Sequence, residues 1–211
     1  MEIWVAFQQK RMGICAMSRI ASYKPCNMVD GQGVRNSVYF AGCEFNCFGC
    51  YNKAIQNFNA QGIDYNAKVR DVIVEELNLD YIQGISILGG EPLHPKNIVD
   101  VCDLVASIKD RYGDKKDIWL WTGYTYEELK TRLAVADKYF RTCLYLTTDE
   151  MHAIRYLLRN IDVLIDGRFD ATLHKKDLTF RGSSNQRIIL CKESFAGRHK
   201  KLYLWKNGDY Q

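Results

Sequence analysis

The sequence predicts a single-domain α/β fold in which helices cover a parallel β-sheet. From about residue 18 onward, strand signals alternate with helix signals, the pattern of parallel strands joined by helical connections. Polar or Gly-rich clusters follow directly after four of the predicted strands. The 211 residues, 47% of them hydrophobic, supply one substantial core and are too few for two independent ones.

Four short apolar runs predict buried strands, because each is rich in β-branched, aliphatic or aromatic residues and each ends at a glycine or a polar residue. These runs are 38–41, 85–88, 118–121 and 163–165. Two windows with apolar residues at helical spacing predict amphipathic helices, at 68–77 and 97–111.

Two capping boxes predict further helix starts, because a Thr side chain and a Glu three residues later can bond each other's backbone N–H. One is Thr125 with Glu128, and the other is Thr147 with Glu150, ahead of a segment around 151–158.

Beyond Asp170 the pattern weakens, although 187–190 and 202–205 are strand-like. The first residues carry no clear period. The predicted organisation is therefore a peripheral N-terminal segment at 1–17 and one domain at 18–211.

The clusters after the strands predict a shared site. In parallel α/β folds the carboxyl ends of the strands lie on one side, where several loops build a cavity. The alternative is that glycine merely terminates each strand. Because four clusters each occupy the same position, directly after a predicted strand, we favour a shared cavity. The clusters lie at 43–52, 89–92, 122–124 and 166–168.

Composition excludes several classes of protein. The net charge of +4 is mild and spread along the chain, so it does not indicate nucleic-acid binding. No apolar run approaches the ~18 residues that span a membrane, and the apolar residues 1–7 are too short for a signal peptide. We therefore expect a cytoplasmic protein that binds neither nucleic acid nor membrane. In that compartment, eight Cys indicate metal binding or reactivity rather than structural disulfides.

Three of these cysteines, Cys43, Cys47 and Cys50, lie within eight residues. Such spacing lets three sulfurs face one metal centre without long-range folding. A tetrahedral zinc site needs four N or S ligands, and no His stands at zinc-knuckle spacing. A [4Fe–4S] cluster usually takes four Cys, so three would leave one iron open to an exogenous ligand. The pattern favours such a cluster over zinc, with coincident thiols as the remaining alternative.

These residues carry a resemblance. The spacing Cys43-x3-Cys47-x2-Cys50 after the first strand, with Gly89-Gly90-Glu91-Pro92 after the second, resembles the radical S-adenosylmethionine (SAM) superfamily. The stretches 121–124 and 181–187 narrow the resemblance to the activating proteins of anaerobic ribonucleoside-triphosphate reductases. Over about residues 18–190, the matching stretches in order are 30–31, 33–35, 41–53, 89–95, 117–124, 162–169 and 181–187. The resemblance implies a partial (β/α) barrel of the radical SAM type.

In that family, a reduced [4Fe–4S] cluster binds SAM at its open iron, and one electron cleaves SAM to methionine and a 5′-deoxyadenosyl radical. The cofactors carry this chemistry, and the protein orients them. The resemblance implies that Glu91 and the glycine backbone meet the SAM ammonium, because glycine permits close approach. The implied cluster ligands are Cys43, Cys47 and Cys50, and the implied SAM-binding residues are Gly89, Gly90 and Glu91.

Thr122 and Asp166, together with Arg168, are the further candidates for the ribose or the methionine end of SAM. Two of the proposed roles have structural alternatives. Glu91 would also suit a helix N-terminus, where an acid complements the macrodipole. Asp166 would also suit a turn before Gly167.

Many superfamily members carry an aromatic residue just before the third Cys, where it touches adenine. This chain has Gly49 there. Phe48 and Tyr51 are the candidates to take over the contact. The four His lack a supporting constellation and receive no role.

The resemblance implies an enzyme whose radical abstracts a hydrogen atom from a Gly Cα in the large subunit of the anaerobic (class III) reductase. That reductase and a low-potential electron donor such as reduced flavodoxin are the expected partners. The rival functions are activation of another glycyl-radical enzyme, such as pyruvate formate-lyase, another radical SAM reaction, or a non-catalytic iron–sulfur or zinc-binding module. The stretch 134–158 is longer than in compact family members and is predicted to form an extra helix pair.

Overall fold

The computed structural model describes residues 17–140, 148–195 and 201–205. Seven strands form one sheet in the order β3-β1-β2-β4-β5-β6-β7. Apart from Met17, the expected peripheral segment at 1–17 lies outside the described residues. The strands are β1 (Arg19–Asn27), β2 (Arg35–Phe40), β3 (Ile63–Asp64), β4 (Gly84–Gly89), β5 (Asp117–Trp121), β6 (Val163–Asp166) and β7 (Arg187–Leu190).

The centre of the sheet is parallel and its flanks are antiparallel. Strands β2, β4, β5 and β6 pair in parallel, and they contain the four strands expected from apolar runs. Strands β1 and β3 on one side, and β7 on the other, pair antiparallel. The sheet is therefore mixed and open, with edges at β3 and β7. The expectation of a parallel sheet holds for the centre alone, because β1, β3 and β7 pair antiparallel with their neighbours.

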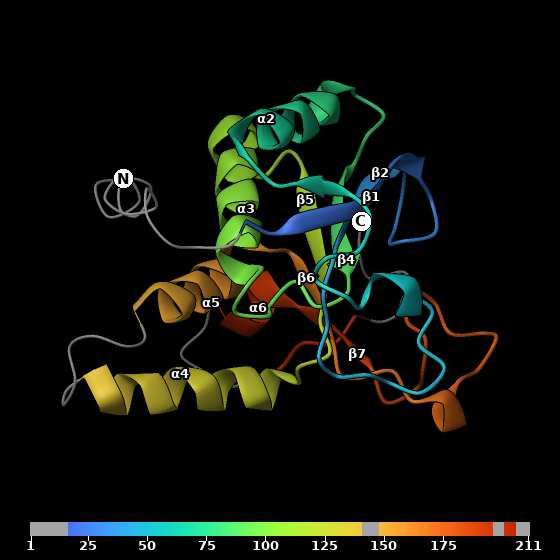
Figure 1. Cartoon of the computed structure of the whole chain (residues 1–211), viewed down its shortest axis with the longest axis vertical. Helices are drawn as coiled ribbons and strands as arrows, with labels where there is room; N and C mark the ends of the chain where they lie inside the picture. The colour runs from blue at the N-terminus through green and yellow to red at the C-terminus, as the bar shows by residue number, and fades with distance from the viewer. Residues whose placement is uncertain (1–16, 141–147, 196–200, 206–211) are drawn as a thin grey trace.

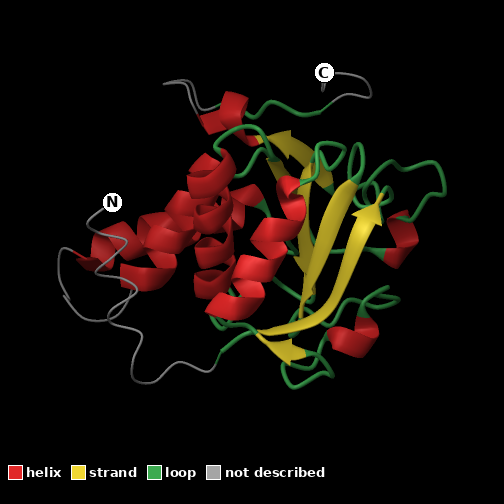
Figure 2. Ribbon diagram, turned by 90° about the horizontal axis from the view of Figure 1, so that it is seen from above, coloured by secondary structure: helices red, strands yellow, loops and turns green. Residues whose placement is uncertain are grey.

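The long helices gather on one side of the sheet, and mainly loops cover the other side (Figures 1 and 2). None of the helices in the described part of the chain is long and apolar enough to cross a membrane. The helices are α2 (Ala67–Glu75), α3 (Ile98–Tyr112), α4 (Tyr126–Phe140), α5 (Thr148–Asn160) and α6 (Cys191–Phe195), with 3-10 turns η2 (Lys53–Ile55), η3 (Glu76–Asn78) and η4 (Ala171–Leu173).

The first predicted capping box is present. The Thr125 N–H donates to Glu128 Oε2 at 2.8 Å, and the Glu128 N–H donates to Thr125 Oγ1 at 3.1 Å, which starts α4. In the second box Thr147 lies outside the described residues, although α5 begins directly after it. The strand-like stretch 202–205 forms an isolated antiparallel bridge, between Leu204 and Ile189.

Strand alternation divides the core between the two faces of the sheet. On β5, Ile118 and Leu120 belong to the large core cluster that includes the helices. Trp119 belongs to a smaller cluster on the opposite face, against which Trp121 packs, with their ring centroids 5.9 Å apart. The core on the second face is therefore largely aromatic. The loops that carry the predicted site residues follow the carboxyl ends of the parallel strands.

Candidate functional site

The loop after β2 carries the three clustered cysteines, and two backbone hydrogen bonds fix where it starts. The Gly42 N–H donates to the Ile55 carbonyl and the Cys43 N–H donates to the Gln56 carbonyl, both at 2.8 Å. Gly42 has a φ of +94°, and a Cβ there would lie 2.0 Å from the Phe58 ring. Only glycine adopts this positive φ without strain and has no Cβ to clash with the Phe58 ring. Gly42 therefore allows the chain to turn from β2 into the cysteine loop.

The loop after β4 meets the cysteine loop backbone to backbone. The Glu91 N–H donates to the Gly42 carbonyl at 2.7 Å, and a Cβ on Gly90 would lie 2.2 Å from that oxygen. Gly89 has a φ of +126°, and its Cβ would lie 2.2 Å from the Phe40 carbonyl. The Gly-Gly pair is therefore required by the close approach of the two loops, before any ligand is considered.

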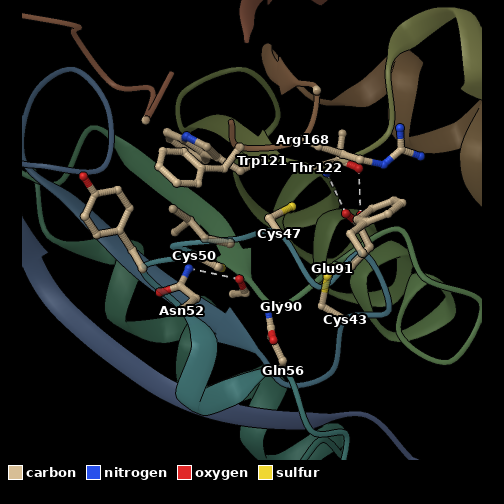
Figure 3. A pocket seen from close by; sticks show the side chains of 18 of the residues that line it. Cys43, Cys47, Cys50, Asn52, Gln56, Gly90, Glu91, Trp121, Thr122 and Arg168 are labelled. Carbon is tan, nitrogen blue, oxygen red and sulfur yellow. Dashed lines mark hydrogen bonds between the residues drawn. The ribbon is translucent and has the colours of Figure 1, made fainter. Parts of the chain in front are cut away.

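Two amide side chains hold the same loops together. Asn97, 1% exposed, donates from Nδ2 to the Ala41 carbonyl at 2.9 Å and to the Glu91 carbonyl at 3.0 Å. Asn52 donates to the Gly89 carbonyl at 3.0 Å (Figure 3). Sequence reasoning assigned neither residue a role, since an isolated Asn carries no spacing signal.

The Glu91 carboxylate is buried and holds the loop after β5. Its Oε1 accepts from the Leu93 N–H at 2.8 Å and from Thr122 Oγ1 at 2.7 Å, and its Oε2 accepts from the Gly123 N–H at 2.7 Å (Figure 3). Burial raises the pKa of Glu91 to about 7, and these hydrogen bonds oppose that rise by favouring the ionised form.

A cavity of about 170 Å³ opens where these loops meet, at the carboxyl ends of the parallel strands. All four clusters that follow the predicted strands contribute to it, so the convergence expected from the sequence is confirmed. Its lining residues are Cys43, Phe45, Cys47, Cys50, Tyr51, Asn52, Gln56, Leu88, Gly89, Gly90, Glu91, Trp121, Thr122, Gly123, Gly167, Arg168, Phe169, Gly182 and Gln186.

Two thiols in this cavity, those of Cys43 and Cys47, favour the protonated form while no metal is bound. Burial raises the pKa of Cys43 to about 11, and the negative charge of Glu91 adds to the effect. Burial also raises the pKa of Cys47, whereas the Phe169 N–H and the charge of Arg168 oppose that rise. Because a metal centre takes thiolates, its binding here must release these protons.

The donor set suits a cluster held by several thiols. Figure 3 shows Cys43, Cys47 and Cys50 distributed along one cavity. A closed zinc site takes four N, S or O ligands, whereas a [4Fe–4S] cluster takes thiolates on its separate irons. The three cysteines of this loop supply thiolates for three irons and leave the fourth open.

Three of the remaining predicted residues line the cavity. Thr122 lies beside Glu91, and Tyr51, 73% exposed, stands directly after the third Cys. Arg168 also lines it and pairs with Glu128 at 2.9 Å. By contrast, Phe48 is 89% exposed and is not among the residues that line the cavity.

Asp166 does not line the cavity either. It is 1% exposed, and its carboxylate accepts from the Tyr126 N–H at 2.8 Å and from Arg187 Nε at 3.0 Å. Its contacts therefore fix the loop after β6 against α4 and β7. Asp166 is the last residue of β6, and Gly167 follows it with a φ of +97°. The printed bonds of its carboxylate run to other elements and not to a local turn.

Sequence reasoning missed several lining residues, among them Phe169, Gly182 and Gln186. Gln186 Oε1 accepts from the Gly182 N–H at 2.8 Å, and its Nε2 donates to the Gly167 carbonyl at 2.9 Å. These bonds fold the stretch 181–187 onto the loop after β6. Its resemblance to the family was the available signal, but nothing in the sequence indicated which residues would face the cavity.

Comparison with known proteins agrees with this geometry. A protein-family model described as a 4Fe-4S single cluster domain matches residues 29–189. The chain is 37% identical over 168 residues to the "Anaerobic ribonucleoside-triphosphate reductase-activating protein" of Pasteurella multocida (strain Pm70), which covers 79% of this chain and 93% of that protein.

Proteins of the same name from Enterobacteria phage T4 and Escherichia coli (strain K12) are 36% and 37% identical. The phage match covers 78% of this chain and 88% of the relative, and the E. coli match covers 78% and 93%. On this similarity, and with a three-cysteine loop facing a Gly-Gly-Glu loop, the chain belongs to the family of anaerobic ribonucleoside-triphosphate reductase-activating proteins.

Proposed function

We propose that this chain is a radical SAM activating enzyme that generates a glycyl radical on the anaerobic (class III) ribonucleoside-triphosphate reductase. One observation carries the proposal: the loop with three cysteines and the Gly-Gly-Glu loop line one cavity at the carboxyl ends of the parallel strands. The reductase is the target in this proposal because the relatives are named for activating it.

In this proposal Cys43, Cys47 and Cys50 hold a [4Fe–4S] cluster, and SAM is the second cofactor. Together, when bound, these groups supply the one-electron cleavage that makes a 5′-deoxyadenosyl radical. The chain's own contribution is to bind, orient and shield them. Three Cys leave one cluster position for a non-protein ligand, which supports SAM as the species bound there.

Gly89, Gly90 and Glu91 bind the ammonium end of SAM in this proposal. Both glycines line the cavity, and Oε2 of Glu91, which accepts one hydrogen bond, keeps capacity for a further donor, whereas Oε1 already accepts two. Thr122 orients that carboxylate and Tyr51 stands at the nucleoside side. Asp166 contributes to SAM binding indirectly in this proposal, because its carboxylate fixes the start of the loop that carries Arg168.

We also propose that the open sheet is the partial (β/α) barrel of the radical SAM type. Four adjacent parallel strands, helices on one side and a cavity at the carboxyl ends support this assignment. The proposal further includes one radical SAM domain at 18–211 with a peripheral segment at 1–17, a cytoplasmic location, and a low-potential donor such as flavodoxin.

The test is anaerobic. The protein is reconstituted with iron and sulfide, reduced with dithionite and assayed with SAM for 5′-deoxyadenosine and methionine, with and without the reductase. We expect both products, and a glycyl radical signal by electron paramagnetic resonance when the reductase is present. Cys43→Ala should lose iron and products. Cys26→Ala, at an exposed cysteine outside the cavity, is the matched control and should keep both. Bound zinc in place of iron, or a cluster without products even with the reductase, contradicts the proposal.

A further inference from the structure

We propose that Phe169 supplies the aromatic surface against which the adenine ring of SAM binds, an assignment that rests on the proposed function. Phe169 lies in the loop after β6 and lines the cavity. A purine is a flat, largely apolar ring, and proteins commonly bind such rings by stacking them on an aromatic side chain. The cavity therefore needs one aromatic ring that is both held in place and available.

The Phe169 ring lies against the cysteine loop. It packs on Tyr51, with ring centroids 5.4 Å apart, and a Cβ built on Gly49 would lie 3.6 Å from its Cε1. Gly49 and Tyr51 flank Cys50, one of the proposed cluster ligands. The ring therefore lies next to the part of the cavity where SAM has to bind if it occupies the open cluster position.

Two glycines leave room for opposite edges of the Phe169 ring. A Cβ on Gly182 would lie 2.8 Å from Cδ2, and a Cβ on Gly49 would lie 3.6 Å from Cε1. Gly182 does not have the positive φ that would demand glycine, so the ring is what a side chain there would displace. Tyr51 supports the same ring, with centroids 5.4 Å apart. The ring is thus clamped at its edges while it lines the cavity.

The other aromatic rings in the cavity are engaged elsewhere. Phe45 packs edge-on against Tyr124, with centroids 4.8 Å apart, and the Arg168 guanidinium lies over it at 4.4 Å. The indole N–H of Trp121 donates to the Phe180 carbonyl at 2.9 Å.

Tyr51 is 73% exposed and faces His174, with its hydroxyl 3.5 Å from the imidazole nitrogens. Phe169 also has ring neighbours, Tyr51 and His174, at centroid distances of 5.4 Å and 6.3 Å. Among the cavity's aromatic rings, it is the one that lies between the cysteine loop, at Gly49, and the stretch 181–187, at Gly182.

The first experiment measures binding, not turnover. Cluster-loaded protein is titrated anaerobically, by equilibrium dialysis, with SAM and separately with 5′-deoxyadenosine, which lacks the methionine end. Phe169→Ala should weaken both affinities roughly tenfold, the size of one base–aromatic stack. Phe169→Tyr should restore them, and Phe169→Leu should stay weak because it keeps apolar volume without a π face. Tyr81→Ala, at an exposed ring outside the lining, is the control and should bind like the unchanged protein.

A double-mutant cycle tests whether Gly182 acts through the ring. Gly182→Ala should weaken SAM binding when Phe169 is present and have little effect in the Phe169→Ala background. Equal effects in both backgrounds would overturn the clamping argument. Unchanged affinity in Phe169→Ala, with normal iron content, would overturn the assignment itself. No SAM binding by the unchanged cluster-loaded protein would instead reject the proposed function, so the two failures are distinguishable.

Discussion

The hydroxyl of Thr122 donates a 2.7 Å hydrogen bond to the Oε1 atom of Glu91, and this bond joins the loop after β5 to the loop after β4 at the edge of the cavity. The same hydroxyl accepts from the Tyr124 N–H at 3.1 Å. Because the Gly123 N–H holds the other carboxylate oxygen, Glu91 is oriented before any ligand arrives. Preorganised groups of this kind lower the cost of binding a charged ligand.

Replacing Thr122 with Val removes that hydroxyl at nearly constant volume. We expect a loss of about 1–2 kcal/mol in the free energy of unfolding, because Oε1 of Glu91 loses a donor and the Tyr124 N–H loses its acceptor. Urea denaturation measures the loss. Thr122→Ser keeps the hydroxyl and should stay close to the unchanged protein. Equal stability of the Val and Ser variants would contradict the role given to this bond.

The raised pKa of Glu91 predicts a specific pH dependence. Folding shifts that pKa from 4.5 to about 7, mainly by burial, so the folded protein keeps a proton that the unfolded chain releases. The stabilising effect is fully present below pH 4.5 and is lost as the pH rises through about 7. In the metal-free protein, Glu91→Gln should flatten this slope, and the difference between the two curves amounts to about 3 kcal/mol. Urea titrations across that range test it, and parallel curves would be the contrary result.

Asn97 is expected to stabilise the two loops jointly. Asn97→Ala leaves the buried Ala41 and Glu91 carbonyls without their shared donor, which should cost about 1–3 kcal/mol. It should also speed the loss of cluster iron to a chelator, since the cysteine loop starts directly after Ala41. Asn59→Ala, at an exposed position, serves as control. Normal chelation kinetics in a destabilised Asn97→Ala protein would show that the cysteine loop is independent of this amide.

A substitution at Arg187, which pairs with Asp166, distinguishes a positioning role of Asp166 from a role as a SAM ligand. Asp166 is 1% exposed, so Arg187→Met leaves a buried carboxylate without its cation and should cost about 3–5 kcal/mol. SAM affinity of the folded, cluster-loaded fraction should change little, because Asp166 does not line the cavity. Denaturation and dialysis are measured on the same preparation. A large affinity loss at unchanged stability would return Asp166 to the ligand role inferred from sequence.

Local patterns in the chain were enough to predict the elements that build the site. The apolar runs coincide with β2, β4, β5 and β6, the first of them running one residue past the end of β2 at Phe40. The Thr125 capping box begins α4. These signals depend on neighbouring residues alone. Strands β1, β3 and β7 joined the sheet by antiparallel pairing, and of the three the sequence indicated only β7, as the strand-like stretch 187–190. Pairing is a contact between two segments, so the pattern within one segment does not predict it.

The sequence alone determined which loops carry the chemistry. Cysteine spacing and the Gly-Gly-Glu motif are short-range features, and strands of one direction bring their ends together. Folding decided which side chains face the cavity. It turned Asp166 toward Arg187, brought Asn97 between two loops and set the Phe169 ring between Gly49 and Gly182. Those outcomes follow from packing and hydrogen bonding between segments far apart in the chain, which residue order does not encode locally.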